Sequence, residues 1–265
     1  MKRLALSLAL AALLTTGASA AGPVYVDGKA VDAAAQVQDN TTYVSLRAIT
    51  EALRPDAGVA WATDRAAVSA WDLTLTAKPG ETYLEANGRA LYIPGGVRLD
   101  AGRTLVPVRT LAAALGAQVD WNAATGAVTV TSGSGAIQPA EDYYADDALL
   151  WLSRIISAES QGEPLTGKIA VGNVVLNRVK NPQFPSTIYG VIFDDRWGGQ
   201  FEPVRNGTVY LPPTAESVLA AKLVLDGADV AGNSLYFLAP ALTDDHWMME
   251  NRPYVMTIGA HWFYE

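Results

Sequence analysis

One glutamate sits on the apolar stripe of a predicted amphipathic helix. Leu152, Ile155 and Ile156 precede Glu159 at the spacing of a single helix face. Burial disfavours the charged form of a carboxyl group and so raises its pKa. The helix is expected to end near Gly162-Glu163-Pro164, and the carbonyl end of a helix dipole also disfavours a negative charge. Glu159 is therefore a candidate general acid at neutral pH, with a solvated residue at a helix end as the alternative.

The other reactive side chains narrow the kinds of chemistry available. The chain has no cysteine, which excludes thiol nucleophiles, disulfides and thiolate metal sites. Its two histidines, His246 and His261, are too few for a three-histidine zinc site and lack the spacing of an HExxH motif. The sequence contains no phosphate-binding loop, no dinucleotide fingerprint and no GxSxG elbow. We therefore expect no metal and no other cofactor.

Two further helices are predicted to complete the region around Glu159. Thr166 is a suitable N-cap for a helix that ends near Lys180, and Thr214 for a helix that ends near Leu225. Between these helices the chain is rich in aromatic and turn-forming residues, with a short strand expected after the last helix.

Length, composition and charge indicate a folded protein of one or two domains. The chain has 265 residues, of which 50% are hydrophobic and 17% charged. A net charge of −8 argues against nucleic acid as a partner. Lys2 and Arg3 precede an apolar run that is short for a membrane span, and Ala18-Ser19-Ala20 has the small residues of a cleavage site. We predict a signal peptide and a secreted protein of the periplasm or cell envelope, with an uncleaved anchor as the alternative.

An internal repeat with an offset of about 60 residues occupies the chain from 24 to 131. Asp27-Gly28 matches Asn87-Gly88 as a hairpin turn, and Trp61 matches Trp121. Each copy is predicted to form a hairpin, a short strand, one helix and a closing hairpin. The helices are expected over 47–53 and 109–115.

The repeat contains three tryptophans on predicted alternating strands, Trp61, Trp71 and Trp121. We expect these indoles to pack in the core, with glycan binding by exposed indoles as the alternative. The paired DG and NG turns, the segments YVSLR and LVPVR, and the tryptophan after each helix resemble the stalk domain first described at the N-terminus of copper amine oxidases. The resemblance implies a small α+β fold with an envelope-targeting or spacer role, and it implies no copper.

The segment from about Leu149 to Tyr264 resembles the SleB/CwlJ-type cell-wall hydrolases, the spore cortex-lytic enzyme family. The matching motifs are RIISAESQGEP, GKIAVGNVVLNRVKNPQFPSTIYGVI, GGQFEPV, NSLYFLAP and IGAHWFYE, in that order. The resemblance implies a lysozyme- or lytic-transglycosylase-like fold that acts on the glycan strands of peptidoglycan, with Glu159 as the essential acid. The stalk repeat stands where spore members often carry another wall-binding module, which favours general wall turnover over spore germination.

The resemblance favours a lytic transglycosylase, which needs one carboxyl group, to cleave between N-acetylmuramic acid and N-acetylglucosamine. Muramidase-type hydrolysis of the same bond stays open, because Glu163, Asp194, Asp195 and Glu202 could supply a second carboxylate. The residues expected to hold the sugars are Gln200, Phe201, Asn177, Tyr189 and Tyr236.

Two other classes of function compete with cleavage of the glycan. A stem-peptide amidase would need zinc on His246, His261 and a carboxylate, whereas we expect His261 to be structural. A wall-binding protein without activity is the second alternative. Peptidoglycan is the expected partner in either case, and no protein partner is predicted.

The expected architecture is α+β in two domains. The predicted divisions are a signal peptide at 1–20, a duplicated stalk domain at 21–131 with repeats at about 24–72 and 83–131, a linker at 132–147 and a catalytic domain at 148–265. Antiparallel strands surround one helix in each stalk repeat. The catalytic domain is mainly helical with a short β part. The linker ends at Asp146 and Asp147, either of which is expected to cap the helix of Glu159.

Overall fold

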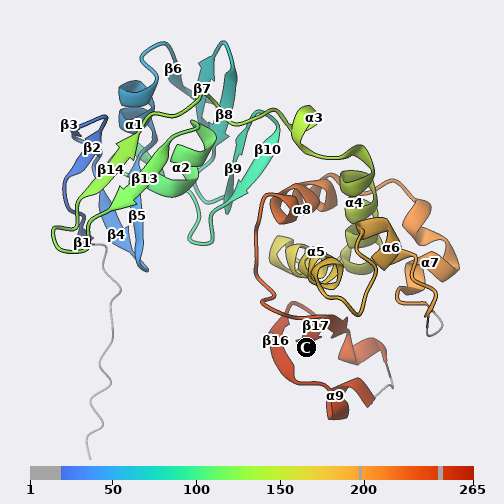
Figure 1. Cartoon of the computed structure of the whole chain (residues 1–265). Coiled ribbons are helices and arrows are strands. Elements are labelled where there is room, and N and C mark those ends of the chain that lie inside the picture. Colours follow the sequence, from blue (N-terminus) through green and yellow to red (C-terminus); the bar gives the residue numbers. More distant parts are fainter. Residues whose placement is uncertain (1–18, 197–198, 244–246) are drawn as a thin grey trace, which may run out of the picture.

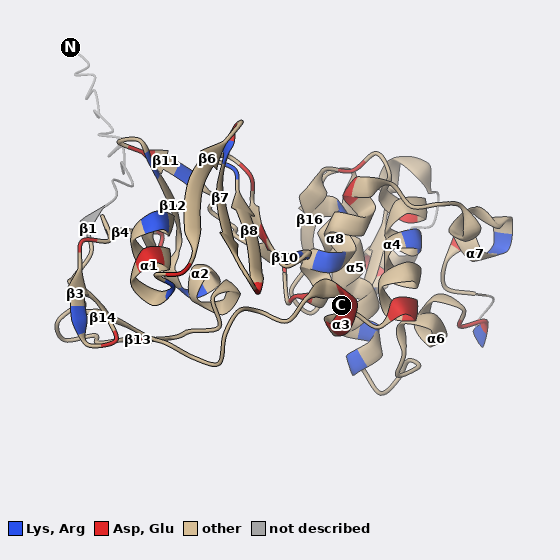
Figure 2. Cartoon of the chain, turned by 90° about the horizontal axis from the view of Figure 1, so that it is seen from above, with Lys and Arg blue, Asp and Glu red and all other residues tan. Residues whose placement is uncertain are grey.

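The computed structural model describes residues 19–196, 199–243 and 247–265, so most of the predicted signal peptide lies outside the described residues. A β-rich N-terminal domain is followed by a mainly helical C-terminal domain (Figure 1). Acidic and basic residues are distributed along both domains (Figure 2). None of the helices within the described ranges is long and apolar enough to cross a membrane.

Three sheets and two short helices build the N-terminal domain. The first sheet has the strand order β1 (Ser19–Ala20), β4 (Gln36–Gln38), β5 (Thr41–Ser45), β12 (Arg103–Pro107), β11 (Arg98–Asp100). The second has the order β10 (Arg89–Tyr92), β9 (Tyr83–Ala86), β8 (Leu73–Ala77), β7 (Arg65–Ala70), β6 (Gly58–Ala62). The third has the order β13 (Gln118–Trp121), β14 (Val128–Thr131), β2 (Val24–Val26), β3 (Lys29–Val31). The helices are α1 (Leu46–Leu53) and α2 (Val108–Ala114).

The two repeats are interleaved. Every sheet combines strands of both copies. The copies pair directly through the parallel pair β2–β14 and the antiparallel pair β5–β12, and in the second sheet β8, which lies between the repeats in sequence, joins β7 to β9. The opening hairpin β2–β3 of the first copy thus lies beside the closing hairpin β13–β14 of the second. Equivalent residues of both copies, such as Val44 and Val106 or Ile49 and Leu111, are fully buried in one common core. The repeats therefore form one folding unit.

The two matched turns have the same backbone conformation. Asp27 and Gly28 have φ values of 47° and 77°, and Asn87 and Gly88 have 48° and 77°. Two successive residues with positive φ form the turn whose twist suits a two-residue hairpin, and Asn-Gly and Asp-Gly adopt it most readily. The hairpin turns predicted at both positions are confirmed.

The expectation that the tryptophans pack in the core is wrong. Trp61, Trp71 and Trp121 are 52%, 89% and 57% exposed. Trp61 and Trp121 lie on β6 and β13, which are edge strands of their sheets, and Trp71 lies in the turn between β7 and β8. No further layer of the described structure covers these positions, because the core fills only the inner faces of the sheets.

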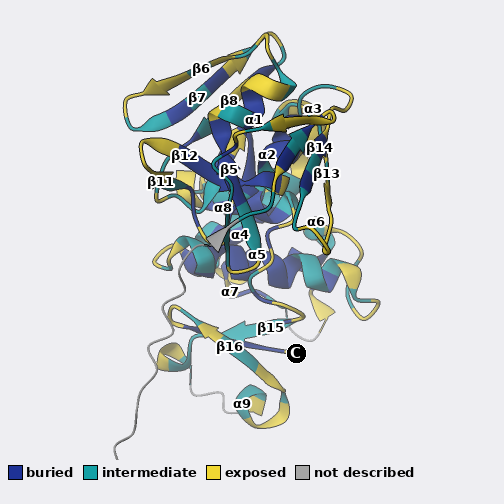
Figure 3. Cartoon of the chain, turned by 90° about the vertical axis from the view of Figure 1, so that its left-hand side faces the viewer, coloured by how far each residue is buried: buried dark blue, intermediate teal, exposed yellow. Residues whose placement is uncertain are grey.

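Three helices form the centre of the C-terminal domain: α4 (Asp146–Ser160), α5 (Leu165–Lys180) and α8 (Ala215–Leu225). Their shared core is dark blue in Figure 3 and includes Leu152, Ile155 and Ile156, the stripe that precedes Glu159. The shorter helices are α6 (Ile188–Ile192), α7 (Glu202–Asn206) and α9 (Trp247–Asn251), with 3-10 turns at Thr208–Tyr210 and Pro240–Leu242. An antiparallel sheet in the order β15 (Tyr236–Leu238), β17 (His261–Tyr264), β16 (Tyr254–Ile258) completes the domain.

The helix caps differ in part from those predicted. Thr214 caps α8 as expected, since its hydroxyl accepts a hydrogen bond from the Ser217 amide. Thr166 does not cap α5, which begins after Pro164 without a side-chain cap. Asp146 and Asp147 lie in the first turn of α4, where the helix dipole favours them, and the N-cap is Ala145.

The segment between the domains is structured and packs against both. It contains the short helix α3 (Ala140–Tyr143), and the Asn87 side-chain amide donates to the Ile137 carbonyl at 2.9 Å. Next to it, Arg89 of β10 forms an ion pair with Asp226 at the end of α8, and the Tyr144 hydroxyl donates to the same carboxylate. Polar contacts therefore join the two domains around Asp226.

Candidate active site

Glu159 lines a cavity of about 590 Å³ in the C-terminal domain. The last turn of α4 brings Glu159 to the end of the buried stripe, as the spacing predicted. The other walls come from α7, the strand β15 and the start of β17. The lining residues are Arg154, Ser157, Ala158, Glu159, Gln161, Glu202, Pro203, Asn206, Thr208, Leu211, Pro212, Phe237, Leu238, Ala239, Leu242 and His261.

The environment of Glu159 keeps its carboxyl group partly protonated at neutral pH. Burial raises the pKa of Glu159 to about 7, and the negative charge of Glu202 acts in the same direction. The positive charge of Arg178 opposes this rise. A pKa close to the working pH suits a group that must donate a proton and then accept one.

Arg178 is a functional candidate that the sequence analysis missed. It projects from α5 and is only 4% exposed, and its Nε donates to the Leu235 carbonyl at 2.7 Å. Its guanidinium lies 5.1 Å from the ring centres of Phe184 and of Phe201. Burial lowers the pKa of Arg178 to about 10, so the side chain stays charged at neutral pH. A buried arginine in the sequence LNRVK at helical spacing gives no signal that separates it from a surface arginine.

Of the four possible second carboxylates, only Glu202 shares the cavity with Glu159. Its side chain is 60% exposed and forms an ion pair with Arg205. Asp194 is buried and paired with Arg196 at 2.7 Å, and Asp195 is exposed outside the cavity lining. Glu202 is therefore the one of these four carboxylates that lines the cavity together with Glu159.

Glu163 contacts the C-terminal segment of the chain, at Ala260 and His261. Its Oε2 accepts a hydrogen bond from the Ala260 amide at 2.9 Å and lies 3.8 Å from His261 Nδ1. The His261 ring packs against Phe237 and lines the cavity of Glu159. Burial lowers the pKa of His261, with Glu163 acting in the opposite direction. Glu163 thus fixes the β16–β17 turn beside the cavity.

None of the five residues expected to hold the sugars is among the described residues that line the cavity. Phe201 is buried, with its ring centre 5.1 Å from the guanidinium of Arg178, and Gln200 comes just before it, with its amide 3.4 Å from the Arg196 carbonyl. Tyr236 accepts a hydrogen bond from Arg252 at 3.0 Å. Trp197, an aromatic residue of the same segment as Gln200, lies outside the described residues.

Asn177 and Tyr189 have other contacts in the structure. The Asn177 amide donates to the carbonyls of Gly232 and Ser234 at 2.7 and 3.0 Å, and so ties α5 to the loop before β15. The Tyr189 ring stacks on Phe193 at 4.4 Å beside Trp151. The sugar contacts expected of these two residues stay predictions.

The zinc-dependent amidase would need His246, His261 and a carboxylate to converge. Among the residues that the structure describes, no three histidine, aspartate or glutamate side chains gather as a metal site requires. His246, which that alternative needs, lies outside the described residues.

Both sequence resemblances are confirmed by comparison with known families. Residues 162–264 match the family described as Cell Wall Hydrolase, and residues 25–130 match the family described as Copper amine oxidase N-terminal domain. The first match begins three residues after Glu159.

Known relatives of the C-terminal domain are spore cortex-lytic enzymes. The enzyme of Bacillus cereus is 36% identical over 120 residues, which is 45% of this chain and 45% of the relative. That of Oceanobacillus iheyensis is 33% identical over 133 residues, 50% of this chain and 46% of the relative. The chain thus spans about half the length of the curated relatives that it matches.

Two solved catalytic domains are also similar in sequence. The catalytic domain of the germination-specific lytic transglycosylase SleB from Bacillus anthracis is 34% identical, with 46% of this chain and 97% of that chain covered and a TM-score of 0.42. The catalytic domain of the Bacillus cereus SleB protein is 35% identical, with 46% and 92% covered and a TM-score of 0.42.

Proposed function

Because its C-terminal domain belongs to the cell wall hydrolase family, we propose that this chain cleaves peptidoglycan glycan strands as a lytic transglycosylase. The bond cut is the one between N-acetylmuramic acid and N-acetylglucosamine. The observation that carries the proposal is the position of Glu159, which lines a cavity of about 590 Å³ with a pKa raised by burial to about 7.

In the proposed reaction one carboxyl group moves a single proton twice. Protonated Glu159 donates to the glycosidic oxygen while the bond from that oxygen to C1 of the muramic residue breaks. The resulting carboxylate then takes the proton of the muramic C6 hydroxyl as its oxygen bonds to C1. The product is a 1,6-anhydromuramic end, and Glu159 is again protonated. The nearby guanidinium of Arg178 stabilises the carboxylate between the two steps.

Hydrolysis is the second candidate, because Glu202 lines the same cavity. In that reaction Glu202 would act as the second carboxylate, either by activating water or as a nucleophile. The products would then be heavier by one water than the anhydro products. The ion pair of Glu202 with Arg205 and its exposure favour the single-acid reaction.

The test is a digest of purified peptidoglycan with products resolved by mass spectrometry. We expect anhydro-muropeptides from the parent protein and a loss of 10²- to 10⁴-fold in rate for Glu159→Gln, the usual contribution of a general acid. Glu202→Gln is the matched control in the same cavity and should retain activity within about tenfold. Hydrated products together with loss of activity in Glu202→Gln would establish hydrolysis, and cleaved stem peptides would refute both reactions.

Residence outside the cytoplasm is part of the proposal. Its support is the basic and apolar N-terminal segment with Ala18-Ser19-Ala20, and the wall-directed family of the C-terminal domain. Mass spectrometry of protein from the culture medium or envelope fraction should give a chain that begins at Ala21. A chain that retains Met1 would contradict processing.

A further inference from the structure

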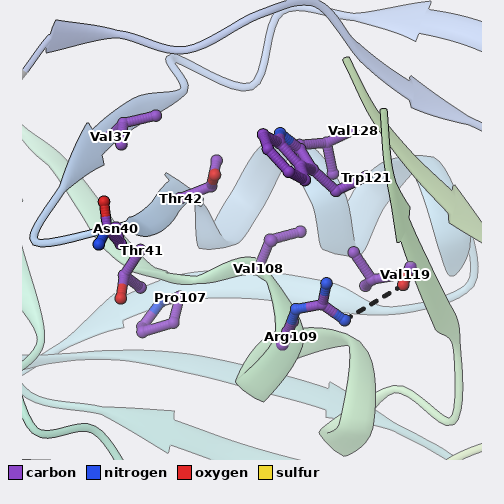
Figure 4. A pocket seen from close by; sticks show the side chains of 10 residues that line it. All are labelled: Val37, Asn40, Thr41, Thr42, Pro107, Val108, Arg109, Val119, Trp121 and Val128. Carbon is purple, nitrogen blue, oxygen red and sulfur yellow. Dashed lines mark hydrogen bonds between the residues drawn. The ribbon is translucent and has the colours of Figure 1, made fainter. Parts of the chain in front are cut away.

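A second cavity, of about 450 Å³, lies in the N-terminal domain. One wall is the start of β5, the floor is the start of α2, and the opposite wall is the hairpin β13–β14 (Figure 4). The two repeats both contribute, since β5 belongs to the first copy and α2 to the second. The lining residues are Val37, Asn40, Thr41, Thr42, Pro107, Val108, Arg109, Val119, Trp121 and Val128.

One side of this cavity offers a flat apolar surface. The Trp121 indole lies beside Val128 and above Val108 (Figure 4). It is 57% exposed although it stands on a paired strand, so its position is fixed while a large part of its ring is open to solvent. A rigid exposed indole of this kind is a surface on which the C–H face of a sugar ring stacks.

The other groups of the cavity supply polar recognition. Arg109 is the only charged residue among the ten described residues of the lining. Its Nη1 donates to the Val119 carbonyl at 3.3 Å, which orients the guanidinium and leaves further N–H donors for a ligand. Asn40, Thr41 and Thr42 present an amide and two hydroxyl groups across the cavity from Trp121 (Figure 4).

The equivalent place in the other half of the repeat shows what differs at this site. A smaller cavity of about 280 Å³ is lined there by Trp61 and Arg47, the counterparts of Trp121 and Arg109. Arg47, however, forms an ion pair with Glu51 at 3.1 Å, and Asp32 and Arg103 add one further carboxylate and one further guanidinium to the lining. The two equivalent cavities therefore differ in charge. The described lining at Trp121 contains Arg109 and no carboxylate, whereas Arg47 in the cavity at Trp61 is neutralised by its ion pair with Glu51.

We infer that the cavity at Trp121 binds a carboxylate-bearing saccharide, with the sugar ring on the indole and the carboxylate on Arg109. Guanidinium and carboxylate form the two-point hydrogen bonds that make arginine selective for this group. Amino sugars with a lactyl ether, such as the muramic residue of wall glycan, have both features. The N-terminal domain would then hold a glycan strand independently of cleavage at Glu159.

The test uses the full chain labelled with 5-fluorotryptophan and observed by fluorine-19 NMR. The chain has 7 tryptophans, and Trp121→Phe identifies the resonance of Trp121. The probe is the disaccharide N-acetylglucosaminyl-N-acetylmuramic acid, and N,N′-diacetylchitobiose supplies the same sugar frame without the carboxylate. We expect a saturable shift of the Trp121 resonance with the first disaccharide and binding roughly tenfold weaker or more with the second.

Arg109→Gln should weaken binding of the muramic disaccharide by a similar factor, while Arg47→Gln, the matched change in the other cavity, should leave the Trp121 titration unchanged. The titration localises binding to Trp121, so it is separate from any contact of the disaccharide with the Glu159 cavity. No shift up to about 10 mM probe would overturn the inference. Equal shifts with both disaccharides would refute carboxylate recognition, and equal shifts with a free stem peptide would refute a saccharide ligand.

Discussion

Glu159 and Arg178 influence each other from two different helices. Burial shifts each side chain toward its neutral form, and each charge partly offsets that shift in the other. In the proposed reaction, this balance would allow Glu159 to hold a proton before the glycosidic bond breaks and to lose it afterwards. Two consequences of this balance are measurable, one in stability and one in the pH dependence of the rate.

The first concerns the free energy of unfolding of Glu159→Gln. The folded-state pKa of about 7 lies above the ordinary value of 4.5. Between these values the folded state binds more protons than the unfolded state, so parent stability falls as pH rises through this window. The glutamine side chain of the variant does not titrate, so the variant does not lose stability as the pH rises through this window. We expect Glu159→Gln to be more stable than the parent by up to roughly 3 kcal/mol at pH 8 and by little at pH 4.5.

Urea unfolding at both pH values measures the difference between parent and variant. Glu202→Gln removes a negative charge that contributes to the raised pKa of Glu159, so it should reduce the pH dependence of stability without abolishing it. An equal effect of Glu159→Gln at both pH values would mean that the carboxyl group is not held in its protonated form by burial.

The second concerns the alkaline limb of the pH–rate profile, which reports loss of the Glu159 proton. Arg178 lowers the pKa of Glu159, so Arg178→Met should raise that pKa and move the limb to higher pH. Arg178→Lys keeps the charge and should hold the limb close to that of the parent. Loss of peptidoglycan turbidity across pH 5–9 measures the profile. A limb that stays in place in Arg178→Met would show that the two groups are not coupled.

At the residue scale the sequence identified Glu159 but not its surroundings. An apolar stripe that ends in a carboxylate is visible in the periodicity of α4. The contacts of Arg178 with Phe184, Phe201 and Leu235 join segments far apart in the chain, and no local pattern records them. Asn177, which is expected to hold a sugar, has contacts of the same long-range kind, because its amide donates to the carbonyls of Gly232 and Ser234.

The helices illustrate what local sequence can and cannot predict about elements. The sequence located α8 and its cap at Thr214, because the hydroxyl and the following helix are adjacent in the chain. Thr166 has the same local signal, but the helix begins at Leu165 with Pro164 as its N-cap residue, so Thr166 lies inside the first turn.

These two threonines make a matched pair for mutation. Thr214→Ala removes the hydroxyl that accepts from the Ser217 amide, and we expect a loss of about 1 kcal/mol in the free energy of unfolding. Thr166→Ala removes no cap and places a better helix former in α5, so stability should be unchanged or slightly higher. Chemical denaturation measures both. Similar losses in the two variants would contradict this assignment of caps.

The pairing of strands could not be predicted from the repeat alone. Each copy contains the strands of a separate unit, and hairpin turns such as Asn87-Gly88 specify only local pairs. Pairing of β2 with β14 closes a separation of more than 100 residues and is decided by the common core. The exposed Trp61 and Trp121 follow from the same arrangement, because it places β6 and β13 at sheet edges.

In the whole molecule the two domains meet at a buried ion pair. Arg89 and Asp226 have side chains that are 10% and 1% exposed, and Lys222 Nζ donates to the Gly88 carbonyl at 2.7 Å. Ala90 of β10 is buried among residues of the helical core. The N-terminal domain therefore holds a fixed position against α8, and its Trp121 cavity keeps a fixed relation to the Glu159 cavity.

Removal of one partner of the Arg89–Asp226 ion pair should weaken the contact between the two domains. Asp226→Ala leaves the Arg89 guanidinium buried without its carboxylate, and we expect a loss of roughly 3–5 kcal/mol in the free energy of unfolding. The double variant Arg89→Leu/Asp226→Leu leaves no charge at the interface and should recover much of that loss. Lys222→Ala, which removes a single bond at the rim of the interface, is the control and should cost about 1 kcal/mol or less.

Small-angle scattering distinguishes loss of the interface from loss of the fold. Asp226→Ala should increase the radius of gyration while the circular dichroism of the helices and the scattering of the control stay the same. Because neither Arg89 nor Asp226 lines the cavity of Glu159, we expect cleavage of short soluble glycan fragments to persist. Cleavage of intact wall should fall if the Trp121 cavity holds the strand in register with Glu159. Equal rates on both substrates with an expanded molecule would mean that the two cavities work independently.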